Sequence, residues 1–386
     1  MELFQASNQW MSRPDDQRFW DINEMVAKTK AYADASETQE ADMKNISFRP
    51  DGTEVLINAN GQDMRMTHHA FNQVCNGVGA PTSYLRGLVD HELVARCLNH
   101  GAGQHDDKER SLLIDHSTGR PLLRAQTSDR YSRLWNHEIA TELATLGSYG
   151  WKVPPARPVW NQEGGRTRTA SINDTIDFGV NSTLSVKPGD TITPSGLYAS
   201  DHDMFAFMVN PELRVSDGSD GGLMRGFFLW NSEVGSKSIG ATSFMLRSVC
   251  GNHIVWGAEE VFSMRMIHTG DVRQKLQALI GELGLRQQRA ASVDEERIKK
   301  FQTTPIAESG EEVVNFIQEK RILTRRDAAK AFIVGEEWRD TDGDPTTFWG
   351  FANAITRYSQ LGNGAKHTES RANLDTAAGN LLALCN

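Results

Sequence analysis

Residues 226–256 read GFFLWNSEVGSKSIGATSFMLRSVCGNHIVW and form the most strongly patterned stretch of the chain. The apolar residues 227–230 are rich in aromatic side chains, as in a strand that is buried on both faces. Residues 231–235 have the composition of a turn. A second apolar segment then leads into Asn252 and His253. We therefore predict a core strand, a polar turn, and a returning element that brings Asn252 and His253 back near the turn.

The composition is typical of a soluble globular protein. Of the 386 residues, 39% are hydrophobic and 24% are charged, and this length allows two or three subdomains. No apolar run approaches the length of a membrane span, and the first residues lack the basic and apolar regions of a signal peptide. The four cysteines are scattered without C-x-x-C spacing, as expected in a reducing cytoplasm.

The formal net charge of −9 differs from that of a strongly basic nucleic-acid-binding chain. Binding depends on a local patch, however, and the net charge does not describe one. Residues 151–250 are close to neutral, with nine Lys and Arg against ten Asp and Glu, so much of the acidic excess lies elsewhere. The central region is therefore where we look for a basic surface.

Local patterns favour an α+β fold with a central, mostly antiparallel sheet. A hairpin is expected around Pro50-Asp51-Gly52, followed by two helices that begin near Thr67 and Pro81. Residues 111–115 and 121–125 have the pattern of paired strands, whereas the last third has apolar residues at helical spacing. We predict three domains: an N-terminal hairpin and helical subdomain (1–105), a central α+β sheet domain (106–268) and a C-terminal helical unit (269–386).

Three short motifs occur in a fixed order along the chain. They are Ser128-Asp129-Arg130-Tyr131, Asn231-Ser232-Glu233-Val234-Gly235 and Cys250-Gly251-Asn252. Together with residues 69–85 and 353–358, they resemble a phage/plasmid-like protein family of unknown function. The sequence departs from that family at Gly251-Asn252-His253, where members often have Thr-Asn-Gly.

The resemblance spans roughly residues 45–361 and implies a setting rather than an activity. That setting is a bacteriophage, prophage or plasmid, with the product in the bacterial host cytoplasm. Genes of this kind tend to lie among replication, recombination and anti-defence functions, which is an association and not a mechanism.

Two turns carry the strongest candidate binding residues. Arg130 and Tyr131 could clamp a phosphate or carboxylate, because a planar guanidinium binds such groups through two hydrogen bonds. The alternative is a buried Arg–Glu pair that joins two layers of the fold, with Glu138 or Glu233 as the acid. Asn231, Ser232 and Glu233 could contact a ligand or metal, or could cap their own turn.

Metal and covalent chemistry have weaker support. Asp201-His202-Asp203 could form a metal site with His253 and His268, yet no fixed ligand spacing is present. Cys250 follows an apolar strand, where a cysteine is more often part of the core than a nucleophile. The sequence contains neither a phosphate-binding P-loop nor a G-x-S-x-G elbow. We assign no catalytic residue, no metal ligand and no cofactor.

A nucleic-acid surface could use the cations of the central region, with Trp230 and Tyr131 available for stacking on bases. The alternative is that Trp230 belongs to the core and that the cations lie on different faces. The cations concerned are Arg166, Arg168, Arg225, Lys237 and Arg247.

Three functions follow from these observations. The leading one is a non-enzymatic, DNA-associated accessory protein that binds single-stranded DNA and supports recombination or replication, as a homo-oligomer without a membrane partner. The second is a protein-binding inhibitor of a host defence system, which the acidic balance would suit. The third is an enzyme that uses Arg130, Glu233, Asn252 and His253, and it requires the two turns to face one cleft.

Overall fold

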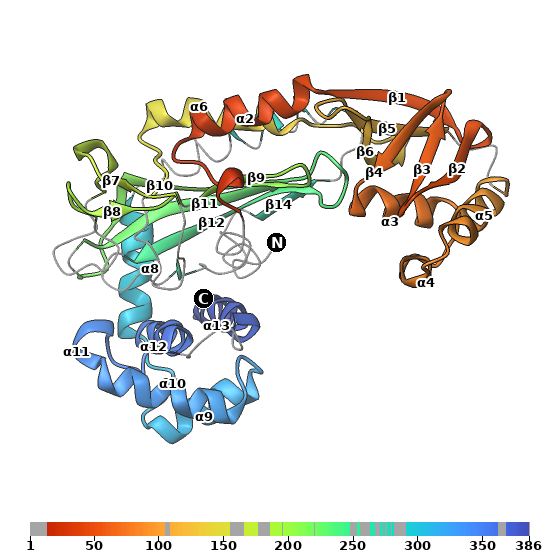
Figure 1. Ribbon diagram of the computed structural model, residues 1–386. Helices are drawn as coiled ribbons and strands as arrows, with labels where there is room; N and C mark the ends of the chain where they lie inside the picture. Colours follow the sequence, from red (N-terminus) through yellow and green to blue (C-terminus); the bar gives the residue numbers. More distant parts are fainter. Residues whose placement is uncertain are drawn as a thin grey trace.

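The computed structural model has an α+β fold with a helical C-terminal region (Figure 1). Short 3₁₀-helices at Asp15–Gln17, Met43–Asn45, Leu146–Tyr149 and Ile172–Asp174 complete the elements given below. The structure describes residues 14–104, 109–154, 166–176, 186–194, 196–219, 221–247, 253–254, 263–266, 271, 273–274, 276–278, 280–281, 291–361 and 368–385.

An N-terminal sheet of six strands has the order β1-β5-β6-β4-β3-β2. The strands are β1 (Ser36–Asp42), β2 (Ile46–Asp51), β3 (Glu54–Ala59), β4 (Gln62–Met66), β5 (Glu109–Asp115) and β6 (Leu122–Ser128). The expected hairpin at Gly52 is confirmed as β2 and β3. The sheet extends across residue 105, where we predicted a domain boundary, because the β5–β6 hairpin pairs with its other strands.

The two halves of this sheet meet at one short parallel contact between β4 and β6. Its register comprises two residue pairs, Arg65 with Leu122 and Met66 with Leu123. All other pairings in the sheet are antiparallel. We call the β4–β6 contact the seam.

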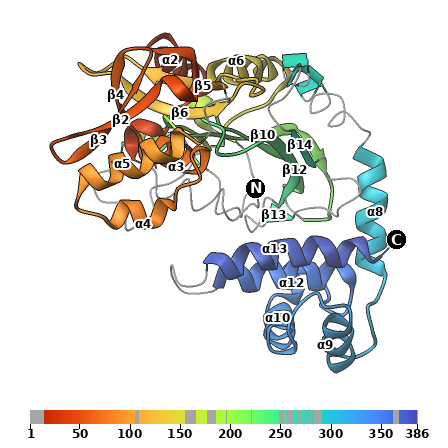
Figure 2. The same cartoon turned by 90° about the vertical axis from the view of Figure 1, so that its right-hand side faces the viewer.

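Three helices pack against the N-terminal sheet, where the sequence predicted two (Figure 2). They are α3 (His68–Gly77), α4 (Thr82–Gly87) and α5 (His91–Ala102). The side chain of Thr67 caps α3 as expected. The second predicted helix is split because Leu88 is extended and Asp90 caps a new helix by accepting from the backbone of Leu93.

The central sheet has the order β13-β12-β11-β10-β9, and β14 also pairs with β12. The strands are β9 (Leu197–Ala199), β10 (Met204–Val215), β11 (Leu223–Asn231), β12 (Ile239–Arg247), β13 (His253–Ile254) and β14 (Ser263–Met266). All nine residues of β11 are buried, which confirms the predicted core strand. The side chains of Phe227 and Leu229 lie on one face of the central sheet. Those of Phe228 and Trp230 pack against other aromatic rings on the opposite face.

The predicted return of His253 to the turn is wrong. Strand β12 runs antiparallel to β11 along its length, so Leu246 pairs with Met224 at the far end from Asn231. The backbone of His253 then pairs with Leu246. Seven residues of extended chain separate Met224 from Asn231, a distance of about 23 Å. Asn252 lies outside the described residues.

Two long helices cover one face of the central sheet, α2 (Ile22–Asp34) and α6 (Asn136–Thr145) (Figure 1). Their buried residues Met25, Ile139 and Leu143 share one core cluster with Phe227 and Leu229. A two-stranded ribbon, β7 (Arg168–Thr169) and β8 (Thr191–Ile192), lies beyond the end of this sheet.

The C-terminal unit is helical and has its own core. Its helices are α8 (Ala291–Thr303), α9 (Gly310–Glu319), α10 (Arg325–Glu337), α11 (Arg339–Asp342), α12 (Phe348–Leu361) and α13 (Thr368–Ala383). The predicted caps at Ser309 and Thr324 are confirmed. Val215 and Leu223 extend this core to the central sheet. Among the residues described, no helix combines the length and apolar character needed to cross a bilayer.

Candidate functional site

The two motif-bearing turns meet in space although they lie a hundred residues apart in the chain. The Tyr131 hydroxyl donates to the Ser232 carbonyl over 2.8 Å. Gly235 has φ 76°, and a Cβ built there would lie 3.3 Å from Thr127 and 3.5 Å from the Tyr131 ring. The site is therefore a contact between the end of β6 and the end of β11, which we call the junction.

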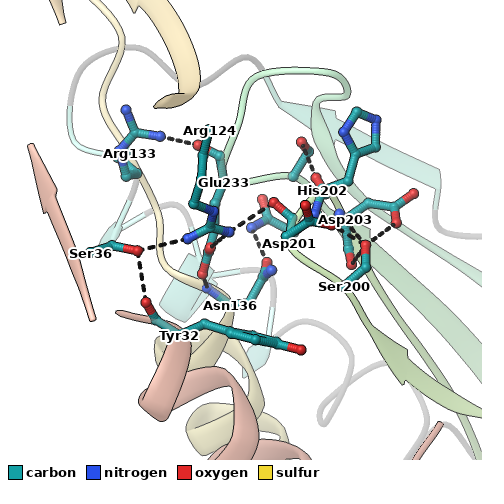
Figure 3. Close-up of polar contacts among 12 residues, drawn as sticks. Tyr32, Ser36, Arg124, Arg133, Asn136, Ser200, Asp201, His202, Asp203 and Glu233 are labelled. Atoms are coloured by element: carbon teal, nitrogen blue, oxygen red, sulfur yellow. Dashed lines mark hydrogen bonds and ion pairs between the residues drawn. The ribbon is translucent and has the colours of Figure 1, made fainter. Parts of the chain in front are cut away.

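Glu233 is the centre of the junction (Figure 3). Its carboxylate accepts from Arg124 Nη2 over 3.1 Å and from the backbone N–H of Asn136 over 2.7 Å. Arg133 donates to the Glu233 carbonyl oxygen. The side chains of Arg124 and Glu233 are 3% and 2% exposed. A buried Arg–Glu pair does join two layers here, but its cation is Arg124 on β6.

Arg124 connects three segments of the chain at once. Besides Glu233, it donates to Ser36 Oγ over 2.9 Å and to the Asp201 carbonyl over 2.8 Å (Figure 3). Arg130, which the sequence singled out instead, is exposed in the loop after β6. The sequence offered one weak signal for Arg124, namely a single charged residue inside the otherwise uncharged strand β6.

Two guanidinium groups contact Glu233, one at its carboxylate and one at its backbone carbonyl oxygen. The second belongs to Arg133, which lies 5.4 Å from the Tyr131 ring centre and 5.9 Å from that of Trp135. Burial lowers the pKa of Arg133, and burial also raises the pKa of the Tyr131 phenol. Tyr131 therefore remains a neutral hydrogen-bond donor, and Glu233 is the acid that balances the buried cations.

A second polar group lies beside the junction, on the turn between β9 and β10. The buried Asp203 carboxylate pairs with Lys237 Nζ over 2.8 Å. The Ser232 hydroxyl donates to the His202 carbonyl over 2.8 Å. Asn231 is also buried and donates to the Leu134 carbonyl over 3.1 Å. The first two contacts hold the start of β10 to the turn after β11, as turn-capping residues do, whereas the third connects β11 to the segment before α6.

His69 and His202 form an edge-to-face pair with ring centres 4.5 Å apart. His69 Nε2 lies 3.1 Å from the Val234 carbonyl. Burial lowers the pKa of both imidazoles, and repulsion from His69 lowers the pKa of His202 further. Within the described part of the chain, no three His, Cys, Asp or Glu side chains are grouped to hold a metal ion. The His253 side chain and His268 lie outside that part.

Four of the five central cations that the sequence suggested for a nucleic-acid surface have described side chains, and each of these is engaged by an acid. Arg166 pairs with Glu24 over 2.6 Å, Arg168 Nη1 donates to Asp174 over 2.9 Å, Lys237 pairs with Asp203, and the buried Arg225 pairs with Asp294. Trp230 is 3% exposed and belongs to the aromatic layer of the core. Arg247 ends β12, and its side chain lies outside the described residues. The structure does not gather the described cations on one surface.

An exposed basic surface occurs elsewhere, where α9 turns into α10. Residues 320–330 contain five Lys and Arg and one Asp. The side chains of all five cations are exposed, and α9 and α10 lie on the side of the helical unit away from the central sheet (Figure 1). We call the set of Lys320, Arg321, Arg325, Arg326 and Lys330 the basic corner. The sequence shows the basic corner as a local run of cations, but this run lies outside the central region where we expected a basic surface.

Comparisons with known proteins give a family match for about half of the chain. Residues 194–378 match the family described as Domain of unknown function (DUF932). The match includes the Asn231–Gly235 turn and the basic corner, whereas Arg124 and the Ser128–Tyr131 turn precede it. No curated protein and no solved structure matches the chain. The matched region is thus similar to a family whose description assigns no activity.

Proposed function

We propose that this chain is a non-enzymatic, DNA-associated accessory protein of a phage or plasmid, and that the basic corner binds DNA phosphates. The observation that carries the proposal is the exposure of five cations in residues 320–330 beside one acid. Contacts to phosphates supply most of the sequence-independent affinity of DNA-binding proteins. Single-stranded DNA is the first substrate to test, because replication and recombination proceed through single strands.

Few cations of the basic corner are held in ion pairs among the described residues. Among the described residues, Arg325 is the member of the corner with an ion pair, a 3.8 Å contact to the exposed Glu311. Asp327 accepts from the Thr324 hydroxyl over 2.6 Å and from the Tyr358 hydroxyl over 3.3 Å. An exposed ion pair such as Arg325–Glu311 contributes little to the free energy of unfolding, about 0–1 kcal/mol. The corner therefore offers positive charge to a partner.

The backbone at Arg321 gives a second argument. Its φ of 57° is left-handed, and Ile322 N donates to the Ile317 carbonyl over 3.0 Å, as in the helix ending that favours glycine at this position. An arginine there costs about 1 kcal/mol or more. Arg325 and Arg326 also occupy the first turn of α10, where the helix dipole disfavours cations. Arginine thus occupies three positions where it lowers the stability of the fold, which supports a role of these side chains in binding.

The junction favours a structural role over catalysis. Both carboxylate oxygens of Glu233 are engaged, and Asn231 and Ser232 are fully buried. The two turns touch directly, so their polar groups bond one another. This arrangement supports the non-enzymatic form of the proposal.

The test is binding of labelled single-stranded and duplex DNA at about 50 and about 200 mM salt, with sizing of the free protein alongside. Wild-type protein should bind single strands and weaken steeply as salt rises. The test variant replaces three corner cations by alanine, and the matched control replaces three exposed cations elsewhere. The two sets are Arg325, Arg326 and Lys330, and Arg96, Lys187 and Lys299.

The corner variant should lose at least about tenfold in affinity, and its salt dependence should fall by about 0.7 per lost contact to single strands. The control should bind like wild type. Arg321→Gly should raise the free energy of unfolding by about 1 kcal/mol while lowering affinity, which separates binding from folding. Equal losses in both triple variants, or no binding at low salt, would overturn the proposal. The second outcome would favour a host protein as the partner.

A further inference from the structure

A pocket of about 500 Å³ lies between the start of α2, the chain at residues 147–154 and the β7–β8 ribbon. Pockets of about 300–1,000 Å³ are the size that holds small organic ligands. The pocket is lined by neither the junction nor the basic corner, and no function assigned above uses it.

The floor of the pocket is apolar and rigid. Trp151 is buried and packs edge-to-face on Phe227, with ring centres 4.8 Å apart. The backbone of Lys152 pairs with Val209 of β10 through bonds of 2.8 and 2.9 Å. Met208 completes the floor from the same strand. Trp151 and Met208 are 3% and 2% exposed, so a ligand meets the small accessible parts of preformed aromatic and thioether groups, against which a flat ring can pack edge-on.

One wall presents the indole of Trp20. The Arg168 guanidinium lies over this ring, 4.6 Å from its centre, and is held there by Asp174. Burial opposes ionisation of Asp174, but hydrogen bonds from Ser171 and Arg168 outweigh it and lower the pKa of this carboxyl. Asp174 is thus ionised and already engaged at neutral pH.

Among the described residues that line the pocket, one cation remains available. Asp21 accepts from the backbone amides of Asn23 and Glu24 over 2.9 Å each, which caps α2. Lys152 is exposed, lines the pocket, and forms no ion pair among the residues that the structure describes. The complementary ligand therefore combines a flat apolar ring with an anionic group.

We propose that this pocket binds the base and phosphate of a nucleotide, with the base on the Trp20–Trp151 side and the phosphate beside Lys152. Either a free mononucleotide or one nucleotide of a single strand has this chemistry. The inference does not depend on the basic corner, because the pocket lies on other elements and can be tested with ligands too small to span both.

The experiment is isothermal titration of the full chain with deoxyadenosine monophosphate, deoxyadenosine and inorganic phosphate. The monophosphate should bind more tightly than the nucleoside or phosphate alone. Lys152→Ala should weaken its binding about two- to fivefold and Lys152→Glu about tenfold, as expected for an exposed ion pair. Binding of the nucleoside should not change. Lys187→Ala, at an exposed site outside the pocket, is the matched control.

Competition distinguishes the two sources of the nucleotide. A short single-stranded oligonucleotide that displaces the monophosphate shows that the pocket holds a nucleotide of DNA, whereas a lack of competition assigns it to a free nucleotide. The triple variant of the basic corner should bind the monophosphate like wild type, so failure of the corner leaves this inference intact. Absence of monophosphate binding, or affinity unchanged by Lys152→Glu, would overturn it.

Discussion

The junction and the basic corner both concentrate arginine, yet they differ in what the arginine is free to do. Arg124 is 3% exposed and is engaged by Glu233, Ser36 and the Asp201 carbonyl. Arg321 and Arg326 are exposed at the end of the helical unit. The difference shows that the neighbours of a cation decide whether it stabilises the fold or recognises a partner. Predictions for the two regions are therefore opposite: variants of the junction should change stability, and variants of the corner should change binding.

The largest effect is expected for Glu233→Gln. The amide keeps the shape of the side chain but leaves Arg124 and Arg133 buried without an acid. Removing one partner of a buried ion pair costs about 3–5 kcal/mol in the free energy of unfolding. Urea denaturation measures this, with the exposed Glu40→Gln as a control expected within about 0.5 kcal/mol of wild type. A loss below about 1 kcal/mol in the free energy of unfolding would show that water reaches the charged groups of the junction.

A smaller effect is expected for Tyr131→Phe. The variant removes the donor to the Ser232 carbonyl and keeps the ring against Arg133. The free energy of unfolding should fall by about 1 kcal/mol, the usual net value of one hydrogen bond. Tyr84→Phe, where the side chain belongs to a residue that is 61% exposed, serves as the control. Equal stability of the two variants would contradict the contact between the two turns.

The histidine pair predicts that the free energy of unfolding depends on pH near and below neutrality. Burial holds the pKa of His69 and His202 below 6.5 in the folded state, so the unfolded chain binds more protons. Their contribution is fully present above pH 6.5 and is lost progressively as the pH falls below that value toward the lower pKa of the folded state. Asp201 and Asp203 oppose the shift in His202, and Lys237 adds to it. Urea midpoints at about pH 7.5 and 5.5 should differ less in His202→Gln than in wild type; an unchanged difference would count against the pair.

The smallest change in stability is expected for the triple alanine variant of the basic corner. Replacing Arg325, Arg326 and Lys330 by alanine should shift the free energy of unfolding by no more than about 0.5 kcal/mol, because exposed charges contribute little. The same variant should show the largest loss of DNA affinity. A variant that unfolds as readily as Glu233→Gln would remove the contrast between the two regions.

The sequence was sufficient to predict the core of the central sheet. An uninterrupted apolar run at residues 227–230 is compatible with burial on both faces, and β11 is buried throughout. Caps at Thr67, Ser309 and Thr324 were also predictable, because a capping side chain acts within three residues of its own position.

Long-range register was not predictable. Arg124 and Glu233 lie 109 residues apart, and no local pattern relates a residue of β6 to the end of β11. The error at His253 has a similar cause: the turn at residue 235 was visible, but the nine residues of β12 carry the chain back along β11. The pattern of the β5–β6 hairpin likewise did not indicate which sheet it would join.

The seam between β4 and β6 has a consequence for how the N-terminal sheet opens. Two residue pairs connect the β2–β3–β4 meander to the rest of the sheet, whereas seven pairs connect β1 to β5. Backbone amide protons exchange with solvent through the opening reaction of lowest free energy that exposes them. Separation along the seam breaks few interstrand hydrogen bonds, so the meander should detach as a cooperative unit before the central sheet unfolds. Amide protons of β3 should then exchange with deuterium earlier than those of β11, and they should do so together.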